Sequence, residues 1–235
     1  MITNTQVLKS CWEKLLDQFQ VEPTGSLEVF LGLVVAYSSV GRYYHTIEHI
    51  QQVLETIERI RTTHSSPRWK TANFPAIELA AWFHDIIYDP QANNNEEKSA
   101  GYTVSKLNKL TIPVDTVERV KQLILNTKTH QALADDIESQ ILLDSDLAIL
   151  GAPEGQYKAY ARSIRQEYSW MDEKPYRAGR THVLQKFLQR ERLYFTDRLF
   201  SDLEVRAKQN MQAEVAALSS QLEFSCFLGQ KEVGL

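Results

Sequence analysis

The stretch Ala80-Ala81-Trp82-Phe83-His84-Asp85-Ile86-Ile87-Tyr88-Asp89 sets a histidine and a carboxylate side by side within an apolar segment. From Ile77 to Tyr88 almost every residue is apolar, so a helix over this segment must be buried on nearly all sides. An ionised Asp85 in such surroundings costs several kcal/mol unless it meets a cation or several hydrogen-bond donors. The pair therefore predicts either a metal site, with His84 as an imidazole ligand, or a core His–Asp pair hydrogen-bonded to nearby backbone.

The composition is that of an ordinary globular protein. The chain has 235 residues, 43% of them hydrophobic, which is enough for one sizeable core and predicts a single domain. The 26 Lys and Arg residues against 30 Asp and Glu give a net charge of −4 without a basic block, so nucleic acid is not expected as a partner. The two cysteines, Cys11 and Cys226, are too few for a disulfide framework and are typical of a reducing cytosol.

The sequence predicts no attachment to a membrane. The first residues carry Lys9, Glu13, Lys14 and Asp17 without a long apolar run, which does not fit a signal peptide. The most apolar early run, Val29 to Tyr37, is far shorter than the roughly 20 residues that span a bilayer. We therefore expect a cytoplasmic protein.

Apolar residues recur at helical spacing along the chain, and no stretch alternates with the period of a strand. Pro, Gly and polar runs separate these segments, which predicts an all-α fold, a bundle of about ten helices. The expected helices lie at about 7–19, 27–35, 44–61, 77–89, 96–110, 115–126, 141–150, 153–170, 176–191 and 196–222.

Two other segments carry residue types that bind metals. Tyr44-His45-Thr46-Ile47-Glu48-His49 places two histidines four residues apart, which on a helix puts both on one face. The run Ile141-Leu142-Leu143-Asp144-Ser145-Asp146-Leu147-Ala148-Ile149-Leu150-Gly151 again sets carboxylates in an apolar segment. Each motif alone also occurs by chance, but with His84-Asp85 they form the ordered set His, His-Asp, Asp on three expected helices.

The last aspartate of this set is either Asp144 or Asp146. They are two residues apart and therefore about 200° apart around a helix, so both cannot comfortably face one ion. If Asp144 ends the loop that begins at Thr127, it can cap the following helix by accepting backbone N–H bonds. This interpretation predicts a capping role for Asp144 and favours Asp146 as the ligand.

Further short motifs accompany the set over about residues 42–192: Arg42-Tyr43-Tyr44-His45, Glu48-His49-Ile50, Trp82-Phe83-His84-Asp85, Tyr88-Asp89, Asn95-Glu96, Ser99-Ala100, Thr127-Lys128, His130, Arg165, Glu167-Tyr168 and Gly179-Arg180. Together with the Asp144–Gly151 run they resemble the HD superfamily of metal-dependent phosphohydrolases, and in particular a bacterial branch of predicted HD phosphohydrolases. The resemblance implies one HD-type helical domain over residues 1–235, with its motif core at about 42–192. Helices within 1–41 and 196–235 would pack on that core.

The resemblance also implies a role for each residue. It implies that a divalent ion (Mn, Fe, Co, Ni, Zn or Mg) binds to His49, His84, Asp85 and Asp146. It implies that His45 protonates the leaving group and that Glu96 orients or deprotonates the attacking water, although Glu96 equally fits a first-turn helix acid. The residues expected to contact the substrate are Lys128, His130, Arg165, Tyr168 and Arg180. Without the resemblance, the same residues would be interpreted as exposed or snorkelling side chains.

We therefore expect an enzyme, a phosphomonoesterase or phosphodiesterase that hydrolyses a small, nucleotide-like phosphate ester with a metal-activated water. One alternative is a di-iron oxygenase of the same fold, which needs additional histidines near the site, and His130 is a candidate. Another alternative is a metal- or nucleotide-binding regulatory protein without turnover. The leaving group and the metal stay open, because the pocket of a helical bundle is lined by residues distant in sequence.

Overall fold

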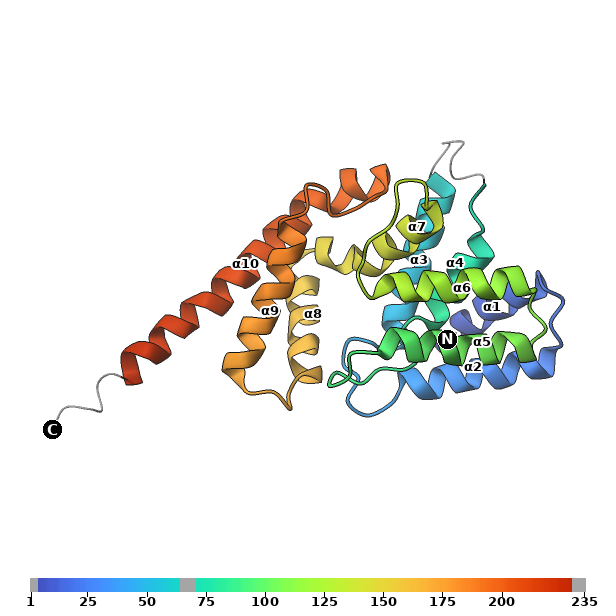
Figure 1. Ribbon diagram of the computed structural model, residues 1–235, viewed down its shortest axis with the longest axis horizontal. Coiled ribbons are helices and arrows are strands. Elements are labelled where there is room, and N and C mark those ends of the chain that lie inside the picture. Colours follow the sequence, from blue (N-terminus) through green and yellow to red (C-terminus); the bar gives the residue numbers. More distant parts are fainter. Residues whose placement is uncertain (1–3, 64–70, 230–235) are drawn as a thin grey trace. The chain divides into compact units, whose positions relative to one another are not determined.

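The computed structural model describes residues 4–63 and 71–229, which form ten α-helices and contain no strand. The fold is therefore all-α, as the sequence predicts. The helices fall into two compact units, the first ending at Asp146 and the second beginning at Leu147 (Figure 1). The HD-type domain over residues 1–235 stays a prediction. No helix in the described ranges is both long and apolar enough to cross a membrane.

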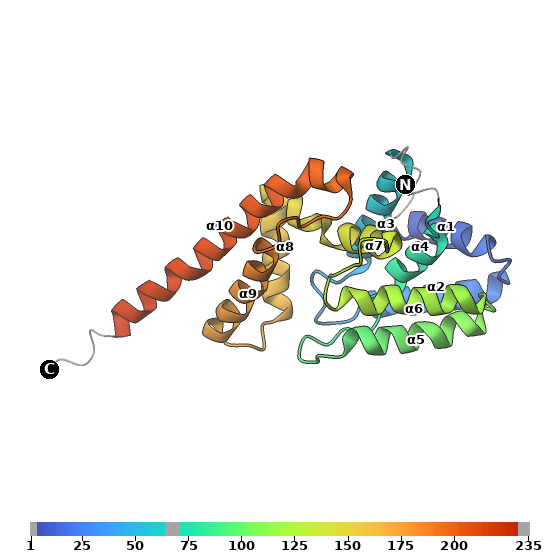
Figure 2. The same ribbon diagram turned by 45° about the horizontal axis from the view of Figure 1, so that its top comes forward.

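The first unit is arranged around one short helix, α4. This helix packs against α1, α3, α5, α6 and α7. Figures 1 and 2 also show α5 and α6 lying side by side, joined by a short turn. The helices of this unit are α1 (Asn4–Asp17), α2 (Pro23–Tyr37), α3 (Ile47–Thr63), α4 (Phe74–Phe83), α5 (Asn95–Lys109), α6 (Val114–Thr127) and α7 (Ile137–Asp146).

Helix α4 begins with a side-chain cap and is buried almost all round. The side chain of Asn73 accepts a hydrogen bond from the Ala76 backbone N–H (3.1 Å), which satisfies one free donor of the first turn. Its apolar residues from Ala76 onward are buried, as the continuous apolar run predicts. The Trp82 ring packs nearly perpendicular to the rings of Trp12 and Phe30, with centroids 5.5 and 6.2 Å apart, and so joins α4 to α1 and α2.

The helix that carries the His-Asp pair is shorter than predicted. It ends at Phe83, with His84 as the C-cap residue, whereas the sequence predicts a helix to about Asp89. Beyond this end, side chains from other segments bond the backbone that a helix would otherwise satisfy. Arg42 donates to the Ile86 carbonyl (2.9 Å), and the Ser99 hydroxyl accepts from Ile87 N–H (3.1 Å).

The histidine pair is also placed differently from the prediction. Helix α3 begins at Ile47, so only His49 lies on the helix, and His45 belongs to the irregular segment before it. The interpretation of His45 and His49 as neighbours on one helix face is therefore wrong. Arg42 donates to the His45 carbonyl (2.9 Å), so a side chain satisfies this backbone group in the segment before α3.

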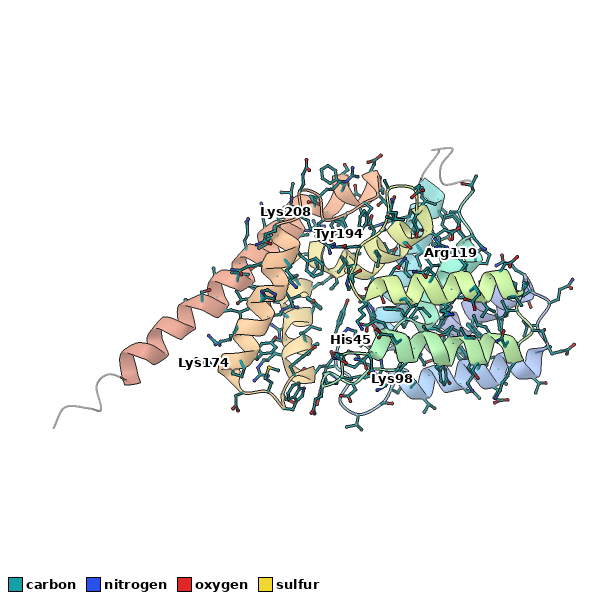
Figure 3. The ribbon with its side chains drawn as sticks, in the orientation of Figure 1. His45, Lys98, Arg119, Lys174, Tyr194 and Lys208 are labelled. Atoms are coloured by element: carbon teal, nitrogen blue, oxygen red, sulfur yellow. The ribbon has the colours of Figure 1, made fainter. Side chains whose placement is uncertain are left out.

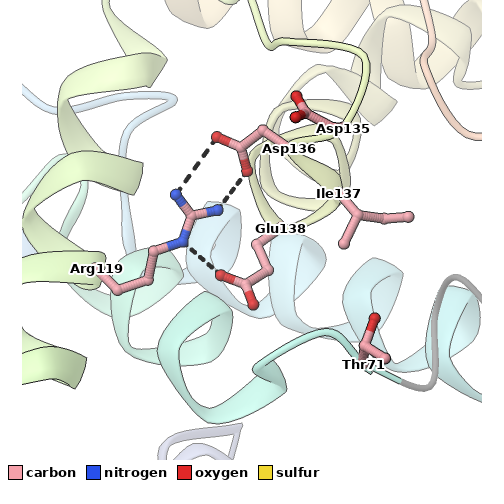
Figure 4. Close-up of a pocket in the computed structure, with 6 residues that line it drawn as sticks. All are labelled: Thr71, Arg119, Asp135, Asp136, Ile137 and Glu138. Carbon is pink, nitrogen blue, oxygen red and sulfur yellow. Dashed lines mark hydrogen bonds and ion pairs between the residues drawn. The ribbon is translucent and has the colours of Figure 1, made fainter.

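The N-terminus of α7 is held by a cation from α6. The guanidinium of Arg119 bonds to Asp136 and Glu138 in a surface pocket (Figure 4). Asp136 also accepts a hydrogen bond from the Ser139 backbone N–H (3.1 Å), so it is the N-cap of α7. Asp144 lies in the last turn of α7, and the capping role predicted for it is therefore wrong.

The second unit consists of a 3₁₀ helix (Leu147–Gly151) and three α-helices, α8 (Glu154–Glu167), α9 (Glu173–Leu188) and α10 (Asp197–Gly229). The 3₁₀ helix lies against α10, where Asn210 donates to the carbonyls of Leu150 (2.8 Å) and Ala152 (2.9 Å). A Cβ at Gly151 would lie 2.6 Å from Leu203 Cβ, so this contact requires glycine. Arg180 joins α9 to α10 through an ion pair with Glu214 (2.8 Å).

Candidate metal centre

Three side chains from separate helices of the first unit converge on one point. His49 lies in the first turn of α3, His84 at the end of α4 and Asp146 at the end of α7. The two Nε2 atoms are 3.3 Å apart, and Asp146 Oδ1 lies 3.2 Å from His49 Nε2 and 3.6 Å from His84 Nε2. The three ligand atoms all lie within 4.8 Å of one another, so this group can hold a metal ion.

The orientation of His84 is set by a backbone hydrogen bond. Its Nδ1 lies 2.9 Å from the Ala81 carbonyl, one turn earlier in α4. Because a carbonyl only accepts, Nδ1 carries the proton and donates it. In the neutral ring this leaves the lone pair of Nε2 directed at His49 and the carboxylates, which is how metal-binding histidines are oriented.

The electrostatics of the group call for a positive charge. Both histidines are buried, with 2% and 1% of their side chains exposed. Burial favours a neutral His84, but the charges of Asp85 and Asp146 outweigh this and raise its pKa well above the usual value. Burial similarly disfavours an ionised Asp146, yet hydrogen bonds from His130, His49 and His84 hold its pKa well below the usual value. A proton or a divalent cation therefore has to offset the carboxylates.

The donor set fits a metal. Two imidazole nitrogens and a carboxylate oxygen suit Mn, Fe, Co, Ni or Zn, and they leave coordination positions for water and substrate. Asp85 flanks the same nitrogens, with Oδ2 3.1 Å from His84 Nε2 and 3.8 Å from His49 Nε2. The four predicted ligands thus lie together, and the assignment of Asp85 as a ligand stays a prediction.

His45, labelled in Figure 3, lies beside the group without belonging to it. Its Nε2 is 3.9 Å from Asp85 Oδ2, and its ring lies against Tyr88 with the centroids 4.2 Å apart. Both His45 and Asp85 keep 19% of their side chains exposed, whereas His49 and His84 are almost fully enclosed. Solvent therefore reaches the centre on the side of His45.

His130 contacts the centre from the loop between α6 and α7. Its Nε2 lies 3.1 Å from Asp146 Oδ2, the carboxylate oxygen that does not face His49. The backbone of His130 has a φ of +50°, which is uncommon for a residue with a side chain. His130 is thus next to the ligand group, whereas its predicted contact with substrate stays a prediction.

The other two predicted residues of the first unit lie at the surface around α5 and α6. Glu96 is in the first turn of α5 and is half-buried, which also fits a helix N-terminal acid. Lys128 follows α6 and bonds to the Asn93 carbonyl (2.9 Å) and to Glu97. The catalytic role of Glu96 and the substrate contact of Lys128 stay predictions.

Arg165, Tyr168 and Arg180 belong to the second unit. Arg165 donates to the backbone carbonyls of Tyr168 (2.7 Å) and Met171 (3.1 Å). Arg180 bonds to Glu214 of α10. Both guanidinium groups therefore have partners within their own unit, and their binding of phosphate stays a prediction.

Sequence reasoning assigned no role to several residues whose side chains hold the helix ends and loops around the site. Arg42 and Ser99 stood within recognised motifs without a role, and Arg119 belonged to no motif. The partners of Arg42 and Ser99 include backbone carbonyls or amides, which look alike at every position of a sequence. For Arg119 the only possible signal in the sequence was a charged residue on helix α6, which has apolar residues along one face.

Comparison of this chain with models of known protein families gives no match, and comparison with curated proteins gives none either. The resemblance to the HD superfamily therefore rests on the motifs of the sequence.

Proposed function

We propose that this protein is a metal-dependent phosphohydrolase of the HD type, a phosphomonoesterase or phosphodiesterase for a small, nucleotide-like phosphate ester. The observation that carries the proposal is the meeting of His49, His84 and Asp146, with His45 beside this group but outside it. An open metal site next to a partly exposed imidazole offers the two functions that ester hydrolysis needs, activation of water and protonation of the leaving group.

The residues of the chain divide these tasks. His49, His84, Asp85 and Asp146 would hold the divalent cation, which would supply activation of a water molecule and neutralisation of charge on the phosphoryl oxygens. His45 donates a proton to the departing oxygen from the exposed side of the centre. His84 would present the lone pair of its Nε2 to the cation, because its Nδ1 is hydrogen-bonded to the Ala81 carbonyl.

The test is phosphate release by metal-free protein reloaded separately with Mn, Fe, Co, Ni, Zn or Mg. The substrates are a panel of phosphate monoesters and diesters that includes nucleotides. With the best metal and ester, His45→Gln should reduce turnover by about 10²–10⁴-fold and leave the metal content near wild type. His182→Gln removes an exposed histidine of α9 and should change neither quantity.

The outcomes separate the proposal from its competitors. Metal binding without hydrolysis of any ester would favour a regulatory metal-binding protein. Equal loss of metal from His45→Gln and His49→Gln would make His45 a ligand instead of a proton donor.

One observation favours a second candidate, the di-iron oxygenase. His130 lies 3.1 Å from Asp146, so an additional imidazole is present beside the group, as that chemistry requires. Two equivalents of iron per chain and oxygen consumption, without phosphate release, would support this candidate over the hydrolase.

A further inference from the structure

The guanidinium of Arg42 connects two segments on either side of the candidate centre. Its Nη1 donates to the His45 carbonyl and its Nη2 donates to the Ile86 carbonyl, each at 2.9 Å. His45 is the proposed proton donor, and Ile86 directly follows the proposed ligand Asp85. One planar side chain thus bridges the backbone of both functional segments.

The backbone carbonyls of His45 and Ile86 need hydrogen-bond donors from outside a helix. His45 lies before the start of α3 and Ile86 lies beyond the end of α4, so neither carbonyl is in the middle of a helix. Carbonyls without a helical or sheet partner are satisfied by side chains or by water. A bridging guanidinium satisfies both, and it sets the separation between the two segments as well.

Aromatic rings hold Arg42 in this position. Its Cζ lies 5.0 Å from the centroid of the Tyr37 ring and 5.4 Å from that of Tyr88. Tyr37 is buried, and its hydroxyl donates to the Trp82 carbonyl in the last turns of α4 (3.0 Å). Tyr88 in turn lies against the His45 ring. The same group of side chains therefore orders both the backbone and the imidazole of His45.

We propose that Arg42 is a positioning residue, which places the His45 imidazole for proton donation by tying its backbone to the segment after Asp85. The catalytic part of this inference rests on the proposed function. Lysine cannot replace Arg42, because an ammonium group has no planar fork to bridge two carbonyls and stack on two rings. Arg42→Lys should therefore loosen His45 while the metal ligands stay in place.

The experiment compares two esters on the same preparation of metal-loaded protein. A p-nitrophenyl ester has a leaving group that departs without a proton, whereas an alkyl ester of the same phosphate class needs one. Arg42→Lys should lower kcat for the alkyl ester by about 10–100-fold, with little change for the p-nitrophenyl ester and in metal content. Because the ratio of the two rates does not depend on the folded fraction, partial unfolding cannot imitate this result.

Two further variants sharpen the comparison. In a His45→Gln background, Arg42→Lys should cause almost no further loss, because both changes remove the same proton donation. Arg61→Lys is the matched control, since Arg61 on α3 also stacks on a ring, that of Phe74 (5.6 Å), and pairs with Glu78 (3.2 Å). This control should leave the ratio of the two rates unchanged. Equal losses on both esters, no loss on either, or additive losses in the double variant would overturn the inference.

A readout without turnover separates this inference from the proposed function. Diethyl pyrocarbonate modifies accessible imidazoles, and mass spectrometry gives the rate at His45. The rate should rise severalfold in Arg42→Lys. If the wild-type protein hydrolyses neither ester, the proposed function fails. A raised modification rate then still supports positioning by Arg42, and an unchanged rate overturns it.

Discussion

Asp146 connects the candidate centre to its surroundings through both carboxylate oxygens. Oδ1 faces His49 and His84, and Oδ2 accepts from His130. Asp144, two residues earlier, is more deeply buried in the same helix but is not in the ligand group found among the described residues. The two aspartates therefore form a natural matched pair.

Replacement of each aspartate in turn by asparagine should show which of the two binds the metal. Asp146→Asn removes the negative charge that faces both imidazoles, so bound metal should be lost on dialysis. Asp144→Asn should keep a full equivalent of metal. Metal analysis and calorimetric titration measure both. Retention of metal by the Asp146 variant together with its loss from the Asp144 variant would reverse the assignment.

The raised pKa of His84 makes metal binding dependent on pH. Burial lowers this pKa, but Asp85 and Asp146 raise it further, so near neutral pH metal-free His84 holds a proton that a cation must displace. The apparent affinity should therefore increase with pH, by up to about tenfold per unit while one proton is displaced. Calorimetry in buffers of different ionisation enthalpy counts that proton. Binding without proton release near pH 7 would contradict this prediction.

The raised pKa of His84 has the opposite effect on the stability of the metal-free protein, which should fall as the pH rises. A raised pKa means that the charged imidazole stabilises the fold fully below its unfolded pKa of about 6.5. This contribution is lost as the pH rises through the raised value. Metal should therefore add most to stability on the alkaline side.

At the scale of elements, α7 reaches the centre with its last residue and is held by Arg119 at its first turn. Arg119 bonds to both Asp136 and Glu138, and Glu138 also accepts from the Asn73 backbone N–H before α4 (2.7 Å). The cation thus joins the beginnings of α4 and α7 to α6, and these two helices carry His84 and Asp146 at their other ends.

Arg119→Met should lower the free energy of unfolding by about 2 kcal/mol, because it leaves two partly buried carboxylates without their cation. Lys121→Met is the control. Lys121 pairs with Glu118 on the exposed side of the same helix, and its loss should cost less than about 0.5 kcal/mol. Urea denaturation measures both, and equal effects would contradict the role assigned to Arg119.

This difference should depend on pH. Burial raises the pKa of Asp136, but hydrogen bonds from Arg119 and Ser139 lower it more, so the net shift is downward. A lowered pKa means that the stabilisation is complete above the usual carboxyl value of about 3.9 and is lost as the pH falls through the lowered value. The gap between wild type and Arg119→Met should therefore narrow in acid.

At the scale of the whole molecule, the candidate centre lies entirely within the first unit. Its histidines and aspartates come from α3, α4, α7 and the segments next to them, all before Leu147. The second unit holds its own ion pairs, such as that of Arg180 with Glu214. Metal should therefore stabilise the protein through contacts made within the first unit.

Saturation with metal should raise the melting temperature. At a free metal concentration of 100 times Kd the native state gains about 2.7 kcal/mol, which corresponds to about 5–10 °C for a chain of this size. Calorimetry of metal-free and metal-loaded protein measures the shift. Asp146→Asn should show almost none of it, and an equal shift in that variant would place the metal elsewhere.

The sequence by itself predicted the fold class and the residue types of the centre. Helices follow from apolar spacing within a single segment, and a His-Asp pair inside an apolar run needs a charged partner wherever the chain goes. The all-α prediction is confirmed, and His49, His84 and Asp146 lie together. Both properties depend on neighbours along the chain or on the identity of a side chain.

The tertiary structure decided where the helices end and what holds the residues around the centre. His45 lies before the start of α3, and α4 ends at Phe83. Arg42 hydrogen-bonds to the backbone of both irregular segments. Asp136, not Asp144, caps α7. These features depend on hydrogen bonds between side chains and backbone groups that are far apart in sequence. Such partners have no periodic signature, because every residue offers the same carbonyl and only the folded chain selects which one is bound.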